Sequence, residues 1–221
     1  MARAFSLFFH CKSRSGFTLP ELMISVLIVG LIATAASVDL RASQYNDELR
    51  TATRVLAADL RSLQSQALTG RNVAMCNDAG GFLVLCETST ALCAAGSACT
   101  MAPPSALGLT LGVGSSTYAF FADVDPAKSG GTLSDATEML TTRDFALLGS
   151  PRVVIHGLRI PASVGTASVA FSRQNGTMGL SGCFAPSCTA PSLLIIELRH
   201  SKTGTINTIE VDAVTGRISA P

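Results

Sequence analysis

The pattern of apolar and polar positions divides the chain into three regions, of which the first is the most apolar. Residues 22–38 carry no charged side chain, and the acids Glu21 and Asp39 bound this run of seventeen residues. At about 1.5 Å per residue, a helix over residues 17–38 is about 33 Å long, close to the roughly 30 Å hydrocarbon core of a bilayer. The run therefore predicts a membrane-length helix over residues 17–38.

Residues 39–69 continue the helical pattern, with apolar side chains on one side only. Apolar residues recur there every three or four positions, as in an amphipathic helix. They are Tyr45, Leu49, Ala52, Leu56, Leu60, Leu63 and Ala67. Gly70 then supplies a suitable C-terminal cap. The apolar stripe predicts that this half of the helix packs against the remaining residues, 70–221.

The third region alternates short β-prone runs with clusters of Gly, Ser, Thr, Pro and Asp, which is typical of antiparallel strands joined by turns. Turn residues at 202–204 and 214–216 predict hairpins, and a loop is expected over 87–116. The predicted fold class is α+β, with a long N-terminal α-helix packed on a C-terminal antiparallel β-sheet domain. The expected strands are 73–75, 82–85, 117–121, 152–158, 167–171, 193–198 and 206–211.

Composition and charge agree with this division. The 221 residues are 48% hydrophobic and only 14% charged, against roughly 25% charged in soluble domains. The net charge of +1 argues against a basic nucleic-acid-binding protein. The first sixteen residues contain three bases and no acid. The positive-inside rule therefore predicts a cytoplasmic N-terminus, with the chain after Asp39 on the other side of the membrane.

Three interpretations of the apolar segment compete. A buried helix of a soluble protein is disfavoured by the flanking positive charge. A secretory signal peptide is suggested by Ala33-Thr34-Ala35, which has the small-x-small form of a cleavage site. However, Glu21 would then place a costly carboxylate near hydrocarbon without a role. The third interpretation is a retained segment in which that carboxylate has a function.

Residues 15–28, SGFTLPELMISVLI, carry that third interpretation. They closely resemble the N-terminal signal of type IV prepilins and type II secretion pseudopilins. The resemblance implies that prepilin peptidase cuts between Gly16 and Phe17 and that Phe17 is then N-methylated. It also implies that Glu21 pairs with the N-terminal amine of a neighbouring subunit during assembly, which offsets the cost of burying its charge.

The same resemblance implies four segments. They are a cleaved leader (1–16), a transmembrane and filament-core helix (17–38), the amphipathic half of the helix (39–69) and a periplasmic β-rich domain (70–221). The chain is expected to be a single-pass inner-membrane protein first and a filament-associated protein later. The expected partners are other pilins, prepilin peptidase and the inner-membrane assembly platform.

A second resemblance extends into the third region. Residues 118–125 (YAFFADVD), 135–140 (DATEML), 209–211 and 215–218 resemble the GspH/FimT group of minor pilins and pseudopilins. The resemblance implies a pilin-like fold and a structural, non-enzymatic subunit without a cofactor. The filament would be a type IV pilus-like filament or a type II secretion pseudopilus.

The cysteines indicate an oxidising compartment. Of seven cysteines, Cys11 lies in the expected leader, and an even number outside the membrane indicates disulfides. Spacing favours three local pairs, namely Cys76 with Cys86, Cys93 with Cys99, and Cys183 with Cys188. A zinc site is the alternative, which is disfavoured because no two of these cysteines are separated by two residues.

Two binding hypotheses and one enzymatic hypothesis remain open. Some pseudopilins bind calcium through loop carboxylates, for which Asp123 and Asp125 are candidates here, with solvated turn acids as the alternative. Some FimT-like minor pilins bind DNA through a C-terminal G-R-x-R, and this chain has GRIS at 216–219. If the protein is a DNA-binding minor pilin of competence, Arg217 is therefore the candidate residue for contacting DNA. A secreted enzyme with an ordinary signal peptide is the last alternative, although no catalytic motif accompanies it.

Overall fold

The computed structural model describes residues 17–86, 93–124, 138–160, 162–173, 178–184, 187–189 and 192–220. For residues 35–40, 42, 162, 181–184 and 187–189 it describes the backbone only. The chain separates into two compact units, Met1–Ser43 and Gln44–Pro221, and each is described by itself.

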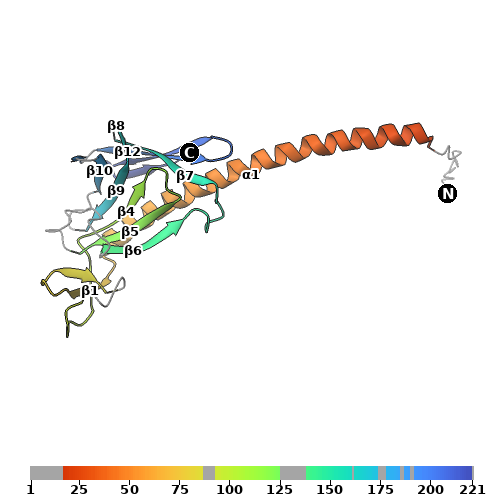
Figure 1. The fold of residues 1–221 in the computed structure, drawn as a ribbon. Helices are drawn as coiled ribbons and strands as arrows, with labels where there is room; N and C mark the ends of the chain where they lie inside the picture. The colour runs from red at the N-terminus through yellow and green to blue at the C-terminus, as the bar shows by residue number, and fades with distance from the viewer. Residues whose placement is uncertain are drawn as a thin grey trace, which may run out of the picture. The chain divides into compact units, whose positions relative to one another are not determined.

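One helix, α1 (Leu19–Thr69), contains both predicted helical segments (Figure 1). It begins after Thr18, whose carbonyl accepts a hydrogen bond from the Leu22 amide at 3.1 Å. Pro20 lies in the first turn, where its missing N–H has no intrahelical partner to lose. The helix ends at Thr69 and is followed by Gly70, whose φ of 73° is accessible to glycine at little cost. The long helix and its glycine cap are therefore confirmed.

The strands of the described residues form three antiparallel sheets. The three-stranded sheet has the order β2-β1-β3, with β1 (Val73–Asn77), β2 (Leu83–Leu85) and β3 (Thr100–Ala102). The six-stranded sheet has the order β11-β10-β9-β4-β5-β6, with β4 (Ala106–Gly112), β5 (Thr117–Asp123), β6 (Met139–Asp144), β9 (Thr166–Ser172), β10 (Met178–Phe184) and β11 (Ser187–Thr189). The five-stranded sheet has the order β14-β13-β12-β7-β8, with β7 (Val153–Ile160), β8 (Ala162–Val164), β12 (Leu193–His200), β13 (Ile206–Asp212) and β14 (Arg217–Ser219).

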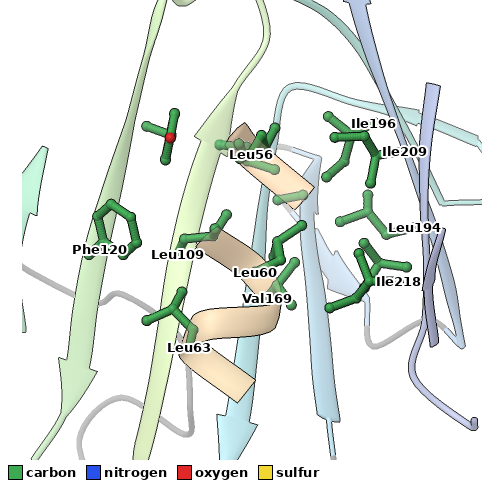
Figure 2. Packing of buried hydrophobic residues seen from close by; sticks show 14 of the residues in the cluster. Leu56, Leu60, Leu63, Leu109, Phe120, Val169, Leu194, Ile196, Ile209 and Ile218 are labelled. Carbon is green, nitrogen blue, oxygen red and sulfur yellow. The ribbon is translucent and has the colours of Figure 1, made fainter. Parts of the chain in front are cut away.

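The core of the second unit is built around the apolar stripe of α1. Figure 2 shows three helical leucines between side chains of the six-stranded sheet and side chains of the five-stranded sheet. Leu56 and Leu60 are completely buried and Leu63 is 2% exposed. Full burial of such a side chain stabilises the fold by about 1.5–3 kcal/mol. The packing predicted for residues 39–69 against the β-rich region is therefore confirmed from Leu49 to Ala67.

All seven predicted strands are present, as are the hairpins at 202–204 and 214–216. The loop expected over 87–116 is wrong where β3 and β4 lie within it, and residues 87–92 lie outside the described ones. In β4 the side chains of Leu107, Leu109 and Leu111 are buried, while Gly108 alternates with them. A Cβ at Gly108 would lie 2.3 Å from the carbonyl oxygen of Val169. At Gly108, therefore, a glycine that suggested a loop instead allows close packing between strands.

Two disulfides are formed among the described cysteine side chains, Cys76–Cys93 and Cys86–Cys99, with Cα separations of 5.6 and 6.2 Å. The predicted pairs Cys76–Cys86 and Cys93–Cys99 are wrong, because the strand register sets Cys76 opposite Val84 rather than opposite Cys86. The presence of disulfides itself is confirmed.

The third predicted pair remains a prediction. Cys183 of β10 and Cys188 of β11 are directly opposed Cα partners, but their side chains lie outside the described ones. Such opposed positions have a Cα separation of about 4.5–5.5 Å, within the range that a disulfide spans.

Candidate functional site

The N-terminal site begins at Phe17, the first described residue. Phe17 is 74% exposed and precedes the helix. Glu21 lies in the first turn of α1, where a negative charge is stabilised by the partial positive charge of the helix N-terminus. Gly16 lies outside the described residues, so the bond that prepilin peptidase is predicted to cut is described on its Phe17 side only.

The helix that follows Phe17 has an exposed apolar surface. From Phe17 to Ile32 the large apolar side chains are between 49% and 75% exposed. They include residues 22–24 and 26–29, so they occupy every side of the helix. The second half of the same helix, in contrast, buries its apolar stripe. A helix that is apolar all round is normally surrounded by lipid or by other helices.

The polar side chains of this segment bond within the helix itself. The Ser25 hydroxyl donates to the carbonyl of Glu21 and the Thr34 hydroxyl donates to the carbonyl of Leu31, both at 2.8 Å. A hydroxyl that is satisfied inside its own helix does not need water. Ser25 and Thr34 are therefore compatible with an apolar environment.

No helix among the described residues is both long and apolar enough to span a membrane. The expectation of a transmembrane span over residues 17–38 thus finds no support in the structure. Its described side chains within α1 run only from Leu19 to Thr34, sixteen residues, whereas a bilayer core takes about 20. The side chains of residues 35–38 lie outside the described ones.

A buried carboxylate in the second unit was missed by the sequence analysis. Asp59 accepts hydrogen bonds from the Arg143 guanidinium, at 2.6 and 2.8 Å, and from the Tyr118 hydroxyl at 2.6 Å. Burial raises the pKa of Tyr118 above its usual value, and the hydrogen bond to Asp59 raises it further. The sequence did hold a signal, because Asp59 lies three residues after Leu56 and four before Leu63, on the buried stripe.

A second polar cluster ties α1 to the five-stranded sheet. His200 is completely buried, and its Nε2 lies 3.4 Å from one carboxylate oxygen of Glu48, while Arg152 lies 3.2 Å from the other. The backbone amides of Lys202 and Thr203 lie 3.3 Å from the His200 Nδ1. Since Nδ1 accepts from these amides, Nε2 carries the proton and donates to Glu48. The imidazole has a structural role and does not face solvent.

Arg217, the candidate DNA contact, is exposed on β14 and is the register partner of Asp212. Hydrogen bonds from the backbone of Thr215, together with smaller contributions that include the charge of Arg217, hold the pKa of the Asp212 carboxyl below its usual value. A carboxylate therefore accompanies this arginine, which weakens its attraction for phosphate.

The calcium hypothesis gains no support from the described residues. Asp123 is 1% exposed at the end of β5, so it is not a solvated turn acid either. Asp125 lies outside the described residues. The one described group of side chains close enough to share a metal is Cys76, Cys86 and Cys93. All three are disulfide-bonded, so they offer no thiolate to zinc.

Residues 11–37 match the family model of the prokaryotic N-terminal methylation motif. Comparison with curated proteins and with solved structures gives no match. The chain therefore carries a type IV pilin-like signal, which suggests a pilin-like subunit that is processed by prepilin peptidase and assembles with other pilins. The finer resemblance to the GspH/FimT group is not confirmed.

Proposed function

We propose that the protein is a minor pilin or pseudopilin of the GspH/FimT type, a structural and non-enzymatic subunit of a type IV pilus-like filament or a type II secretion pseudopilus. The observation that carries this proposal is that the methylation motif and an exposed apolar helix coincide on the same residues. The methylation motif over residues 11–37 overlaps a helix whose apolar side chains remain exposed through Ile32. Such a surface is suited to packing against other helices.

Processing removes residues 1–16 and leaves Phe17 as the N-terminal residue, which is then methylated. The exposure of Phe17 and its position before the first helical turn support this step, because a protease needs an extended and accessible segment. Glu21 becomes the fifth residue of the shortened chain. In the filament its carboxylate pairs with the amine of a neighbouring subunit, so correct axial register offsets the cost of burying the charge.

The expected location is the inner membrane before assembly, with the second unit in the periplasm. The two disulfides support an oxidising compartment for residues 76–99. The apolar segment holds the subunit in the membrane until assembly transfers it into the filament core.

Expression with and without prepilin peptidase tests the proposal. Intact mass should show the loss of residues 1–16 and the gain of one methyl group only when the peptidase is present. A chain that begins near Ala36 both with and without the peptidase would indicate an ordinary signal peptide. The protein would then be a secreted protein, as in the alternative hypothesis of a secreted enzyme.

A further inference from the structure

Strand β6 is an outer strand of the six-stranded sheet. Among the described strands its one neighbour is β5, and residues 141–143 are exposed. Figure 1 shows β6 at the margin of the β4–β5–β6 group. An outer strand presents backbone N–H and C=O groups that can pair with an incoming extended segment. The 141–143 edge can therefore accept another strand.

A cavity of about 220 Å³ lies beside this edge, between α1 and the β5–β6 pair. Thr141 is the register partner of Phe120, and Arg143 is the register partner of Tyr118. Directly opposed residues point to the same face of a sheet, and Tyr118 and Arg143 both bond to α1 through Asp59. Every second side chain of a strand added beside β6 would point to this same face, toward the cavity.

The cavity combines an apolar lining with an excess of positive charge. Leu63, Phe120 and Leu140 supply the apolar surface. The positive charge of Arg143 is compensated by its ion pair with Asp59. Arg71 also lines the cavity and has no acidic partner within the described parts of the chain.

A hydrogen-bonded chain of polar groups holds Arg71 at the cavity. The Arg71 guanidinium donates to Oε1 of Gln66 at 2.5 Å, and Nε2 of Gln66 donates to the Ser62 hydroxyl at 2.9 Å. The remaining N–H groups of Arg71 can bind an anion, and a guanidinium matches a carboxylate in both geometry and charge.

The size of the cavity limits what can occupy it. Small-molecule sites usually measure roughly 300–1,000 Å³, so 220 Å³ suits one side chain better than a cofactor. Two guanidinium groups against one carboxylate favour an acid, and the apolar lining favours methylene groups before it. A glutamate side chain has both properties.

We propose that the β6 edge and this cavity bind an extended acidic segment of another protein. The main chain of that segment adds to β6 alongside residues 141–143, and a glutamate side chain enters the cavity, where its carboxylate accepts hydrogen bonds from Arg71. The main-chain pairing supplies affinity and the cavity supplies selectivity. The site lies within Gln44–Pro221, so its function is independent of how the N-terminus is processed.

The test uses full-length protein in detergent micelles and three fluorescein-labelled peptides, with binding measured by anisotropy. The first peptide is Thr-Val-Glu-Val-Thr, the second has Gln in place of Glu, and the third is the first with alternate backbone amides N-methylated. We expect the Glu peptide to bind at least about tenfold more tightly than the Gln peptide, since a charge-assisted hydrogen bond is lost. N-methylation should also weaken binding, because it blocks strand pairing.

Two variants and one matched control locate the site. Arg71→Gln should weaken binding of the Glu peptide about tenfold. Ser62→Phe retains the Arg71 side chain, fills the cavity and removes the hydroxyl to which Gln66 donates, so it should weaken binding as well. Arg54→Gln removes an exposed arginine of the same helix that does not line the cavity, and should bind like the unchanged protein. Far-UV circular dichroism checks that each variant is folded.

Equal affinity for the Glu and Gln peptides would overturn the proposal, as would unchanged binding in folded Arg71→Gln. Failure of all three peptides to bind at concentrations up to about 1 mM would overturn it too, because a strand-pairing site with a charged anchor should exceed that affinity.

Discussion

Replacement of Tyr118 by Phe isolates one buried hydrogen bond of the second unit. Tyr118 is 2% exposed, and its hydroxyl donates to the Asp59 carboxylate at 2.6 Å. The substitution keeps the ring, which packs 5.6 Å from Phe120 and 5.3 Å from Phe145, measured between centroids. It also leaves the Arg143 ion pair with Asp59 in place. The change therefore removes the hydroxyl and little else.

The expected loss of stability follows from the character of the bond. A hydrogen bond to a charged group contributes about 1.5–3 kcal/mol, so Tyr118→Phe should lower the free energy of unfolding by about 2 kcal/mol at pH 7. The difference should shrink in alkali. The pKa of Tyr118 is raised in the folded state, so the unfolded chain loses this proton first and the stabilisation falls as pH rises above about 10.

The decline amounts to about 1.4 kcal/mol per pH unit. A difference of about 2 kcal/mol is lost over about 1.5 pH units at this rate, so the unchanged protein and Tyr118→Phe should become equally stable about 1.5 units above pH 10. The assay is urea unfolding with the disulfides intact, followed by far-UV circular dichroism, at pH 7 and at several values above pH 10. Tyr45→Phe is the matched control, because Tyr45 is the other tyrosine of the chain, which contains two. A difference in unfolding free energy below about 0.5 kcal/mol at pH 7, or one that does not shrink in alkali, would show that the hydrogen bond from Tyr118 to Asp59 does not stabilise the fold in this way.

Three further predictions concern packing, covalent structure and assembly. Gly108→Ala should destabilise the second unit by about 3 kcal/mol in thermal or urea unfolding, because the added Cβ meets a backbone carbonyl at 2.3 Å; Gly112→Ala, on the same strand, meets nothing closer than 4.0 Å and should cost far less. Non-reducing peptide mapping should recover the 76–93 and 86–99 disulfides together with a third between residues 183 and 188, whereas a 76–86 link would contradict the strand register. Glu21→Ala should leave leader cleavage largely intact but reduce incorporation into filaments, measured by immunoblot of sheared filaments; normal incorporation would show that the carboxylate does not set the register.

The helix and its buried stripe could be predicted because both depend on short-range patterns. Apolar residues at intervals of three or four positions located the face from Leu49 to Ala67, and Gly70 marked its end. The strands of β7, β12 and β13 were equally visible, since β-branched runs between turn residues are local signals.

The errors arose where distant segments meet. Strand β4 lies between β5 and β9, and the need for Gly108 appears only when the carbonyl of Val169 is in place. Cys76 bonds to Cys93 and Cys86 bonds to Cys99, 17 and 13 residues apart along the chain, while the register of β1 with β2 places Cys76 opposite Val84. Short-range patterns do not contain either relation.

The candidate sites differ in the same way. Phe17 and Glu21 belong to one continuous motif, so the sequence could identify them without the structure. Asp59 gains its partners from residues 59 and 84 positions away, and Arg71 lines the cavity beside β6 only because of the fold. Those residues carry no motif and required the structure.

The N-terminal residue of the assembled protein distinguishes a processed pilin-like subunit from a secreted protein with an ordinary signal peptide. Peptide mass spectrometry of protein recovered from sheared surface filaments or from a purified pseudopilus reads that residue and its modification. We expect a chain that begins with N-methylated Phe17 and retains the apolar helix. An unprocessed N-terminus, or a chain that starts near Ala36 and lacks that helix, would contradict this expectation.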